Sequence, residues 1–499
     1  MRVHFVGVSG TGMGSLALLY RAQGHEVTGS DGSFDPPMGP ALAAAGVTCM
    51  QGYSKDHLFP RPDITIVGNA IRKENEEATH VRENHLHAES MSGALRNHFL
   101  AHHRPLVVTG THGKTTTSAM AAWVLHRAGQ NPGYFIGGIP KNFPSGAGLG
   151  DTKRKIASSG KDVAMPGAPP PFVVEGDEYD AVYWHKKPKF LDYVGVGQHD
   201  VVLLTSVEHD HVDIYPTVAS YEQGFVEMIA AIPEGGLLVV DARDARACHL
   251  AKACKAKVVY YALDGDDTGD VTPTWLGAVV GDAARAAEAG VLPANREVQS
   301  FDLFIGGMSC GRLALKVPGA HNVRNAIGAM AACCEAFGVK VADARSALAE
   351  FDGVRRRQDL LGVPSGVHVY DDFAHHPTAV DETLRALKLR HPKGALFAIF
   401  EPRSATACRS LHQEEYVGAF SAAEHVIFAP LGRTNIPEGE RLDLDKLAAR
   451  LGPKALCARD ADEIIGYVKT HAKTGDTVAL LSNGAFGGIH EKMIAALTV

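Results

Sequence analysis

Short apolar runs alternate with helical patterns along most of this chain, and glycine-rich or polar residues follow where the runs end. The N-terminal part contains the runs Val3–Val8, Glu26–Gly29 and Asp63–Val67, and a helical pattern extends to about Gln23 between the first two. Short buried runs that alternate with helices are typical of βαβ units. The pattern therefore predicts a parallel sheet in this part of the chain.

The same alternation starts again at Pro105 and once more near Arg356. The strands expected there are Leu106–Thr109, Phe172–Val174, Val201–Thr205, Val367–Tyr370, Leu396–Phe400, His425–Phe428 and Thr477–Leu481. A length of 499 residues is typical of about three domains. We predict an α/β protein with a Rossmann-like N-terminal domain (1–104), a central P-loop-type ATPase domain (105–355) and a Rossmann-like C-terminal domain (356–499).

Two stretches interrupt the alternation. Ser145–Pro171 is rich in glycine, proline and lysine, and this composition predicts a mobile loop. Residues 263–300 contain DGDDTGD and an alanine-rich run, and we interpret them as an insertion.

Composition excludes several classes of function. The 49 basic and 56 acidic residues give a net charge of −7, so bulk charge does not indicate nucleic-acid binding. No run approaches 18 apolar residues, and the N-terminus lacks a signal-peptide pattern. The eight cysteines form no CxxC pair, which favours reduced thiols. We expect a cytoplasmic protein without a nucleic-acid or membrane partner, and nothing in the sequence specifies an oligomeric state.

The segment VVTGTHGKTTT (107–117) has the form of a phosphate-binding loop between a strand and a helix. Glycines let backbone N–H groups approach phosphate oxygens, a lysine reaches the terminal phosphates, and a threonine hydroxyl can hold Mg²⁺. Gly110, Gly113, Lys114 and Thr115 supply these parts, although two residues separate the glycines where the common loop has four. The segment predicts that ATP or GTP binds here, and the alternative is a chance Gly-Lys-Thr turn.

Acidic and histidine residues follow two further strands of the central unit. Glu175 ends one strand, and the segment Glu208–Asp213, which includes His211, follows another. Parallel strands present their carboxyl ends at one edge of a sheet, so both segments should face the phosphate loop. Mg²⁺ prefers oxygen ligands beside phosphates, which Glu175 could supply, whereas a histidine is a less usual ligand. Solvated acidic turns remain the alternative.

A glycine cluster, Gly7–Gly14, follows the first strand, and Asp31 follows the second. The glycine spacing of the NAD fingerprint is matched only when the motif is started at Gly12, five residues beyond Gly7. An NAD-dependent oxidoreductase is therefore a weak alternative. The loop can bind a diphosphate at the following helix N-terminus, and Asp31 is placed to accept a ribose hydroxyl. A turn without a ligand is the other interpretation.

Smaller polar groups occur farther along the chain. Asn322 and Asn325 begin a helix and suit either an adenine edge or helix capping. The arginines at 355–357 form either a phosphate-binding fork or a solvated basic run. The strand ends at 371–377, 401–404 and 482–490 carry acids, histidines and glycines that suit a ligand's close approach.

Five segments in chain order resemble the Mur ligases of peptidoglycan synthesis: GTHGKTTT, VVEGDEYD, EHDH, GAHNVRNA and DDFAHHP. The resemblance covers nearly the whole chain. It implies an ATP-dependent amide ligase that acts through an acyl phosphate. Its first domain would bind a UDP-sugar, its second ATP, and its third the incoming amine compound.

Within the family, the chain resembles members that use UDP-N-acetylmuramate and add either L-alanine or the tripeptide L-alanyl-γ-D-glutamyl-meso-diaminopimelate. Four segments resemble the tripeptide-adding branch of peptidoglycan recycling: Gly68–Glu77, Met91–Leu100, Phe400–Ala407 and Ser482–His490. We favour the tripeptide, with L-alanine in de novo synthesis as the alternative. A P-loop nucleotide sensor is a more remote one, because it would need no acids and histidines at the strand ends of the third unit.

The resemblance also implies roles for individual residues, with ATP and Mg²⁺ as cofactors. The catalytic residues would be Lys114, Glu175, His211 and His375, and the Mg²⁺ ligands Thr115, Glu175 and His211. ATP would contact Gly110, Thr111, His112, Gly113, Lys114, Thr115, Thr116, His321, Asn322, Asn325, Arg356 and Asp372. UDP-N-acetylmuramate would contact Ser9, Gly10, Thr11, Gly12, Asp31 and Asn69. The amine substrate would contact Arg403, Ser482 and Asn483.

The chain departs from the family pattern at two places. Ser206 stands where the family usually has asparagine, which puts a contact behind the metal site in doubt. Several relatives hold a second Mg²⁺ with a carbamylated lysine, but the corresponding stretch Ser220–Ile229 has no lysine. A second Mg²⁺ would then depend on Glu175 and His211.

Overall fold

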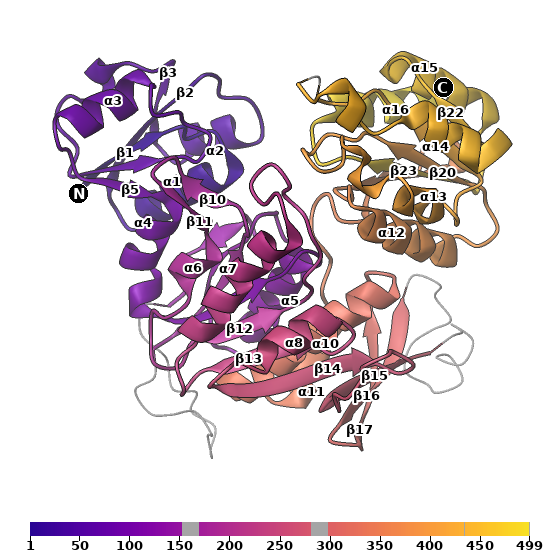
Figure 1. Cartoon of the computed structure of the whole chain (residues 1–499), viewed down its shortest axis with the longest axis horizontal. Coiled ribbons are helices and arrows are strands. Elements are labelled where there is room, and N and C mark those ends of the chain that lie inside the picture. Colours follow the sequence, from indigo (N-terminus) through magenta and orange to yellow (C-terminus); the bar gives the residue numbers. More distant parts are fainter. Residues whose placement is uncertain (152–168, 281–297, 434, 499) are drawn as a thin grey trace.

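The computed structural model describes residues 1–151, 169–280, 298–433 and 435–498. Within these ranges the strands form a 5-stranded, a 10-stranded and a 6-stranded sheet, and one separate 2-stranded hairpin. Each large sheet carries helices, and the N-terminal and C-terminal units both lie against the same side of the central unit (Figure 1). The three-domain α/β fold predicted from the sequence is therefore confirmed, while the domain boundaries at 104/105 and 355/356 stay predictions.

The N-terminal sheet is parallel throughout, with the strand order β3-β2-β1-β4-β5. Its strands are β1 Arg2–Val6, β2 Glu26–Asp31, β3 Thr48–Gln51, β4 Ile64–Val67 and β5 Ala88–Ser90. Its helices are α1 Thr11–Ala22, α2 Met38–Ala44, α3 Glu76–Glu83 and α4 Met91–His98. The central strand β1 is buried almost end to end, as its continuous apolar run predicts.

The central sheet has the order β17-β16-β15-β14-β13-β12-β6-β9-β7-β8. Its strands are β6 Arg104–Thr109, β7 Gly133–Phe135, β8 Ala147–Gly148, β9 Pro171–Gly176, β12 Val201–Leu204, β13 Leu237–Asp241, β14 Lys257–Leu263, β15 Trp275–Val279, β16 Gln299–Ile305 and β17 Met308–Leu315. The separate hairpin is β10 Asp180–Val182 with β11 His185–Pro188. The helices are α5 Lys114–Arg127, α6 Phe190–Tyr193, α7 Val218–Ala231, α8 Ala245–Ala251, α10 Ala320–Phe337 and α11 Val341–Ala349.

Strand periodicity divides the central core into two layers. On β6, Leu106 and Val108 pack with α5 and α10, whereas Val107 packs with the residues of α7 on the opposite face. Successive side chains of a strand point to opposite faces, so a continuous apolar run is needed when helices cover both. This arrangement fixes the carboxyl end of β6 between two helical layers.

The interpretation of 263–300 as an insertion is wrong for its described part. β15 lies within it and β16 begins at its end, and both continue the central sheet, with antiparallel pairing from Trp275↔Ile305 to Val279↔Phe301. The sequence Trp-Leu-Gly-Ala-Val of β15 is short and contains a glycine, so by itself it predicts a strand only weakly. Pairing with the neighbouring strands stabilises it. Residues 281–297 lie outside the described residues, as do 152–168, on which most of the predicted mobile loop falls.

The C-terminal sheet has the order β18-β19-β23-β20-β21-β22, in which β18 alone is antiparallel to its neighbour. Its strands are β18 Asp359–Gly362, β19 His368–Asp372, β20 Leu396–Phe400, β21 His425–Phe428, β22 Ala455–Cys457 and β23 Thr477–Leu481. Its helices are α12 Pro377–Arg390, α13 Glu415–Ala419, α14 Leu444–Leu451, α15 Ala461–His471 and α16 Ile489–Leu497.

Both outer units are joined to the central one by polar contacts. From α4, Arg96 donates hydrogen bonds to the carbonyl oxygens of Asp192 in α6 (2.7 Å) and of Gly195 just after it (3.1 Å). For the C-terminal unit, Lys141 of the central unit forms a 2.6 Å ion pair with the buried carboxylate of Asp359 at the start of β18. Among the described residues, no helix combines the length and apolarity that a membrane crossing requires.

Candidate active site

The phosphate loop connects β6 to α5, as the sequence predicts. Gly110 and Gly113 have φ angles of +122° and +76°, which side-chain-bearing residues rarely adopt. A Cβ atom on Gly113 would lie 2.5 Å from Oδ1 of Asn325, so this position excludes larger residues by space as well as by backbone conformation. The loop ends at Lys114, where α5 begins and its free N–H groups lie.

Three strand ends of the central sheet meet beside this loop. Thr109 at the end of β6 is in register with Gly176 at the end of β9 and with Leu204 at the end of β12. The acidic segments that follow β9 and β12 therefore reach the same edge as the loop. This confirms the expectation drawn from parallel pairing.

Lys114 is held in the loop by both backbone and side-chain acceptors. Its ammonium donates to the carbonyl oxygens of Gly110 (2.7 Å) and Thr111 (3.2 Å) and to Oε1 of Glu178 (2.9 Å). Burial alone would lower the pKa of Lys114, but Glu178 and Asp177 outweigh it and raise that pKa above its usual value. Lys114 therefore carries a fixed positive charge at the phosphate loop.

Glu175 is buried directly beside the loop. Its carboxylate accepts hydrogen bonds from the Thr115 hydroxyl (2.8 Å) and the Gly137 backbone N–H (2.7 Å). Burial and the neighbouring Asp177 raise its pKa. One carboxylate oxygen of Glu178 is also buried without a hydrogen-bond partner. These hard oxygen donors and their excess negative charge fit the requirements of a Mg²⁺ ion.

His211 lies near these acids and pairs with Glu178, not with Glu175. Its Nε2 is 3.9 Å from Oε1 of Glu178, and its backbone has a φ of +52°. Positive φ at a residue other than glycine is uncommon and often marks a functional turn. Ser206, the departure from the family pattern, accepts a hydrogen bond from the backbone N–H of His112 (3.1 Å). Ser206, which stands where the family usually has asparagine, thus supports the phosphate loop.

The start of α10 lies against the other side of the loop. Asn325 approaches Gly113, and its amide NH₂ donates to Oδ1 of Asn322 (3.4 Å); the NH₂ group of Asn322 donates to the Pro318 carbonyl (2.7 Å). His321 precedes them, and its Nε2 lies 3.1 Å from the amide nitrogen of Gln358. Burial lowers the pKa of His321. The predicted adenine-binding residues therefore gather beside the phosphate loop.

A second sheet edge, from the C-terminal unit, faces this site. Asp372 ends β19, Leu481 ends β23 and Phe400 ends β20 in register, which brings the three predicted motifs together. Asp372 accepts hydrogen bonds from the backbone N–H groups of Gln358 and Ala374, each at 2.7 Å.

The other predicted residues of this edge have partners within it or across the interface. Arg356 pairs with Asp371 (3.2 Å) and donates to the Ser482 carbonyl (2.9 Å), and His375 lies 3.9 Å from Asp210 of the central unit. Ser482 donates to Glu401, which also lies 3.5 Å from Arg403. Oδ1 of Asn483 is buried without a hydrogen-bond partner.

In the N-terminal unit, Asp31 closes the glycine loop. Its carboxylate accepts hydrogen bonds from the backbone N–H groups of Ser9 (2.8 Å) and Gly32 (2.7 Å), and Asn69 is exposed after β4. The predicted sugar-nucleotide residues thus share one edge of the first sheet.

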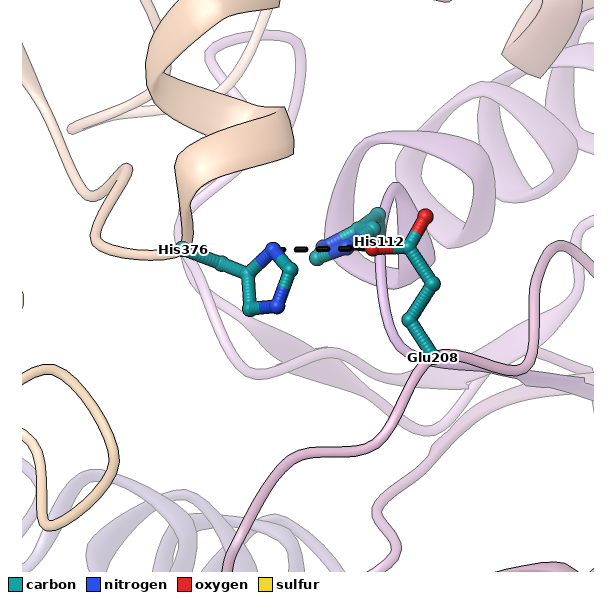
Figure 2. A group of neighbouring side chains, drawn as sticks. All are labelled: His112, Glu208 and His376. Carbon is teal, nitrogen blue, oxygen red and sulfur yellow. Dashed lines mark hydrogen bonds and ion pairs between the residues drawn. The ribbon is translucent and has the colours of Figure 1, made fainter. Parts of the chain in front are cut away.

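The sequence did not single out two kinds of contact. Arg357, interpreted only as part of a basic run, donates to the Thr115 hydroxyl (3.2 Å) and stacks on Phe373, so the C-terminal unit touches the phosphate loop directly. His112, Glu208 and His376 converge from three segments (Figure 2). Residues so far apart in sequence leave no local signal of such a meeting.

Comparison with known proteins agrees with this geometry. Three family models match the chain: "Mur ligase family, catalytic domain" over residues 2–103, "Mur ligase middle domain" over 185–333, and "Mur ligase, glutamate ligase domain" over 356–484. The UDP-N-acetylmuramate–L-alanyl-γ-D-glutamyl-meso-2,6-diaminoheptandioate ligase of Escherichia coli K12 is 33% identical over 100% of this chain and 98% of its own. The chain belongs to the Mur ligase family. Like other Mur ligases it is an ATP-dependent, ADP-forming ligase.

Two further Mur ligases extend the comparison. The UDP-N-acetylmuramate–L-alanine ligase of Rubrobacter xylanophilus is 30% identical over 100% of both chains. The crystal structure of a murein peptide ligase from Psychrobacter arcticus 273-4 superposes with a TM-score of 0.68 at 31% identity, covering 100% of this chain and 99% of that one. The family likeness therefore holds in sequence and in fold.

Proposed function

We propose that this Mur ligase joins UDP-N-acetylmuramate to the tripeptide L-alanyl-γ-D-glutamyl-meso-diaminopimelate in peptidoglycan recycling. The observation that carries the proposal is the full-length match to an E. coli ligase named for this reaction, at 33% identity. The murein peptide ligase structure of P. arcticus supports it. Ligation of L-alanine is the second candidate, supported by the R. xylanophilus relative at 30% identity. ATP and a nucleotide sugar are cytoplasmic metabolites, so we assign the reaction to the cytoplasm.

Phosphoryl transfer depends mainly on positioning and on neutralising charge. We assign the β- and γ-phosphates of ATP to Lys114 and to the loop from Gly110 to Thr116, which includes Thr111 and His112. Asn322 and Asn325, with His321 nearby, would contact adenine. Arg356 and His375 would approach phosphate, and Asp372 the ribose. The positions of these groups on both sides of the phosphate loop support the assignment.

Mg²⁺ would be held by Thr115 and Glu175, with His211 contributing to a second ion. Mg²⁺ bound at these residues would neutralise the negative charge of the ATP phosphates. The hydroxyl-to-carboxylate contact of 2.8 Å and the raised pKa of Glu175 support a cation at this place, because a positive charge would stabilise the buried carboxylate.

The two other substrates approach from the outer domains. We assign UDP-N-acetylmuramate to the first glycine loop, from Ser9 through Gly10 and Thr11 to Gly12, together with Asp31 and Asn69. Arg403, Ser482 and Asn483 would bind the peptide, where an arginine can form a paired hydrogen bond with a carboxylate. The unpartnered buried oxygen of Asn483 supports a polar ligand there.

The reaction would then follow two balanced steps. The lactyl carboxylate of UDP-N-acetylmuramate attacks the γ-phosphorus, and ADP leaves with the electron pair of the broken P–O bond. The peptide α-amine attacks the acyl phosphate, loses a proton, and inorganic phosphate leaves as the amide forms. Contacts such as Arg357 to Thr115 would keep water away from the acyl phosphate when the domains meet.

Phosphate release with separate amine substrates tests the proposal. The full-length protein is given ATP, Mg²⁺ and UDP-N-acetylmuramate with either L-alanine or the tripeptide. We expect phosphate release and a new amide product with the tripeptide. With L-alanine we expect kcat/KM to be at least about tenfold lower, because the protein groups that would bind the rest of the tripeptide would remain unpaired. A preference for L-alanine would establish the second candidate instead.

A further inference from the structure

Three side chains meet where the C-terminal unit touches the phosphate loop; the proposed ligation gives Glu208 and His376 no role and uses His112 only as part of that loop. His112 belongs to the loop itself, Glu208 to the segment after β12, and His376 directly precedes α12 (Figure 2). One ligand atom from each lies within 4.8 Å of both others. Two imidazoles and one carboxylate form a known three-ligand set for zinc-type metals.

The distances agree with coordination by a small dication. Nε2 of His112 is 3.0 Å and Nδ1 of His376 is 3.6 Å from the same oxygen, Oε2 of Glu208. Metal–ligand bonds of 2.0–2.2 Å at tetrahedral angles separate neighbouring ligand atoms by about 3.4 Å. Small side-chain adjustments would therefore bring all three atoms to one ion, with a fourth position left for solvent.

His376 supplies an independent indication of a ligand. Its side chain is only 8% exposed, yet neither ring nitrogen has a hydrogen-bond partner. A buried polar group without a partner costs free energy, so an unsatisfied imidazole that points at a carboxylate requires an explanation. A neutral imidazole offers one ring nitrogen with a free lone pair, which is the usual way in which histidine binds a metal.

The surroundings of Glu208 resemble the support that metal-binding carboxylates usually have. The Thr378 hydroxyl donates to Oε2 of Glu208 (2.9 Å), and the Glu208 backbone N–H donates to the Thr111 hydroxyl (2.8 Å). Such outer contacts orient a ligating group and tune its affinity. They hold Glu208 at the junction of the two domains.

We propose that His112, Glu208 and His376 bind a transition-metal dication of the Zn²⁺ class, which fastens the C-terminal domain to the phosphate loop. Imidazole ligands favour such ions over Mg²⁺, which prefers oxygen. Two ligands belong to the central domain and one to the C-terminal domain, so the metal binds best when the domains are in contact. The site is separate from the Mg²⁺ assigned to Glu175 and does not depend on the identity of the amine substrate.

Visible absorption of Co²⁺ tests the site directly. The full-length protein is stripped of metal, kept in excess Mg²⁺ to occupy oxygen-only sites, and titrated with Co²⁺. Tetrahedral Co²⁺ with nitrogen ligands absorbs far more strongly than six-coordinate Co²⁺ with oxygen ligands. We expect one equivalent of intense absorption that Zn²⁺ abolishes by competition.

Matched variants assign the ligands. His376→Gln and Glu208→Gln should lose the absorption, and Thr378→Val should weaken binding roughly 10- to 100-fold. His412→Gln is the control, because its ring packs 4.6 Å from that of His376 and is outside the three-ligand set, so absorption should persist. Circular dichroism verifies that each variant is folded. Absence of the absorption in the unaltered protein, its persistence in His376→Gln, or its loss in His412→Gln would each overturn the proposal.

Discussion

At the scale of single residues, the phosphate loop depends on one fixed cation. Lys114 is held by two carbonyl oxygens and by Glu178, and these contacts keep its ammonium in the loop. Electrostatic groups that are oriented before the reaction lose little free energy in reorganisation. The neighbouring buried acids thus position the charge that the proposed ATP site would use.

We predict that Lys114→Met lowers kcat for ligation by roughly 10²–10³-fold, because one preorganised charge at the γ-phosphate is lost. Phosphate release in the presence of all three substrates measures the effect. Lys187→Met, which removes a surface lysine paired with Glu227, should leave kcat unchanged. Near-normal ligation by Lys114→Met would contradict the assigned role.

A second residue-scale prediction concerns pH. Burial lowers the pKa of His321, although nearby Glu382 and Asp372 offset part of this effect. The unfolded chain therefore takes up a proton before the folded chain does as pH falls below about 6.5. The folded state should lose up to about 1.4 kcal/mol per pH unit through this group, and stability should be fully present above that pH.

Thermal melts at pH 7.5 and 5.5 in EDTA measure this dependence. We expect Tm to fall less for His321→Gln than for the unaltered protein, whereas His102→Gln, at an exposed position, should behave like the unaltered protein. Parallel decreases in all three proteins would show that His321 does not contribute.

At the scale of elements, α5 has a left-handed glycine just before its first turn and another just after its end. Gly113 and Gly129 have nearly equal φ angles, +76° and +77°, but a Cβ on Gly113 would meet Asn325, whereas one on Gly129 would meet nothing within 4 Å. The pair separates backbone strain from crowding at the nucleotide site.

We predict that Gly113→Ala and Gly129→Ala each cost roughly 1–3 kcal/mol of stability through strain. Only Gly113→Ala should also weaken ATP binding, by about tenfold or more, because it displaces Asn325 from the loop. Calorimetric titration with ATP and thermal melts provide the two readouts. Equal ATP affinity in both variants would show that Asn325 is not part of the nucleotide site.

At the scale of the whole molecule, the C-terminal domain is held over the central one by a few polar contacts. Lys141 pairs with Asp359, whose side chain is 3% exposed, and Arg357 reaches Thr115. Removing one partner of a buried pair leaves an uncompensated charge and is more costly than losing an exposed pair.

We predict that Lys141→Met loosens this contact and increases the radius of gyration in small-angle X-ray scattering. It should also raise the KM for ATP several-fold. Lys316→Met is the matched control, since its 2.6 Å pair with Asp352 is half-exposed and lies within the central domain. The scattering of Lys316→Met should match that of the unaltered protein. If Lys141→Met also scatters like the unaltered protein, the Lys141–Asp359 ion pair does not hold the domains together.

The sequence by itself determined the features that are local. Apolar runs such as Val201–Leu204 predict buried parallel strands, and the glycines and Lys114 predict the phosphate loop, because strand, turn and helix are contiguous in the chain. Parallel pairing also predicts that Glu175 and the segment after β12 share one edge. The weak strand β15 was missed, since neighbouring strands rather than its own pattern stabilise it.

Only the tertiary structure decided which of these groups touch. Glu178 pairs with Lys114 while Glu175 pairs with Thr115, although both acids lie in one segment and have the same chemistry. Arg357 reaches Thr115 across 242 positions, and His376 meets Glu208 between two domains. Such contacts depend on how the separate sheets pack against one another. They also depend on burial, because burial changes how strongly each group interacts with its neighbours. A periodic pattern carries no information about either.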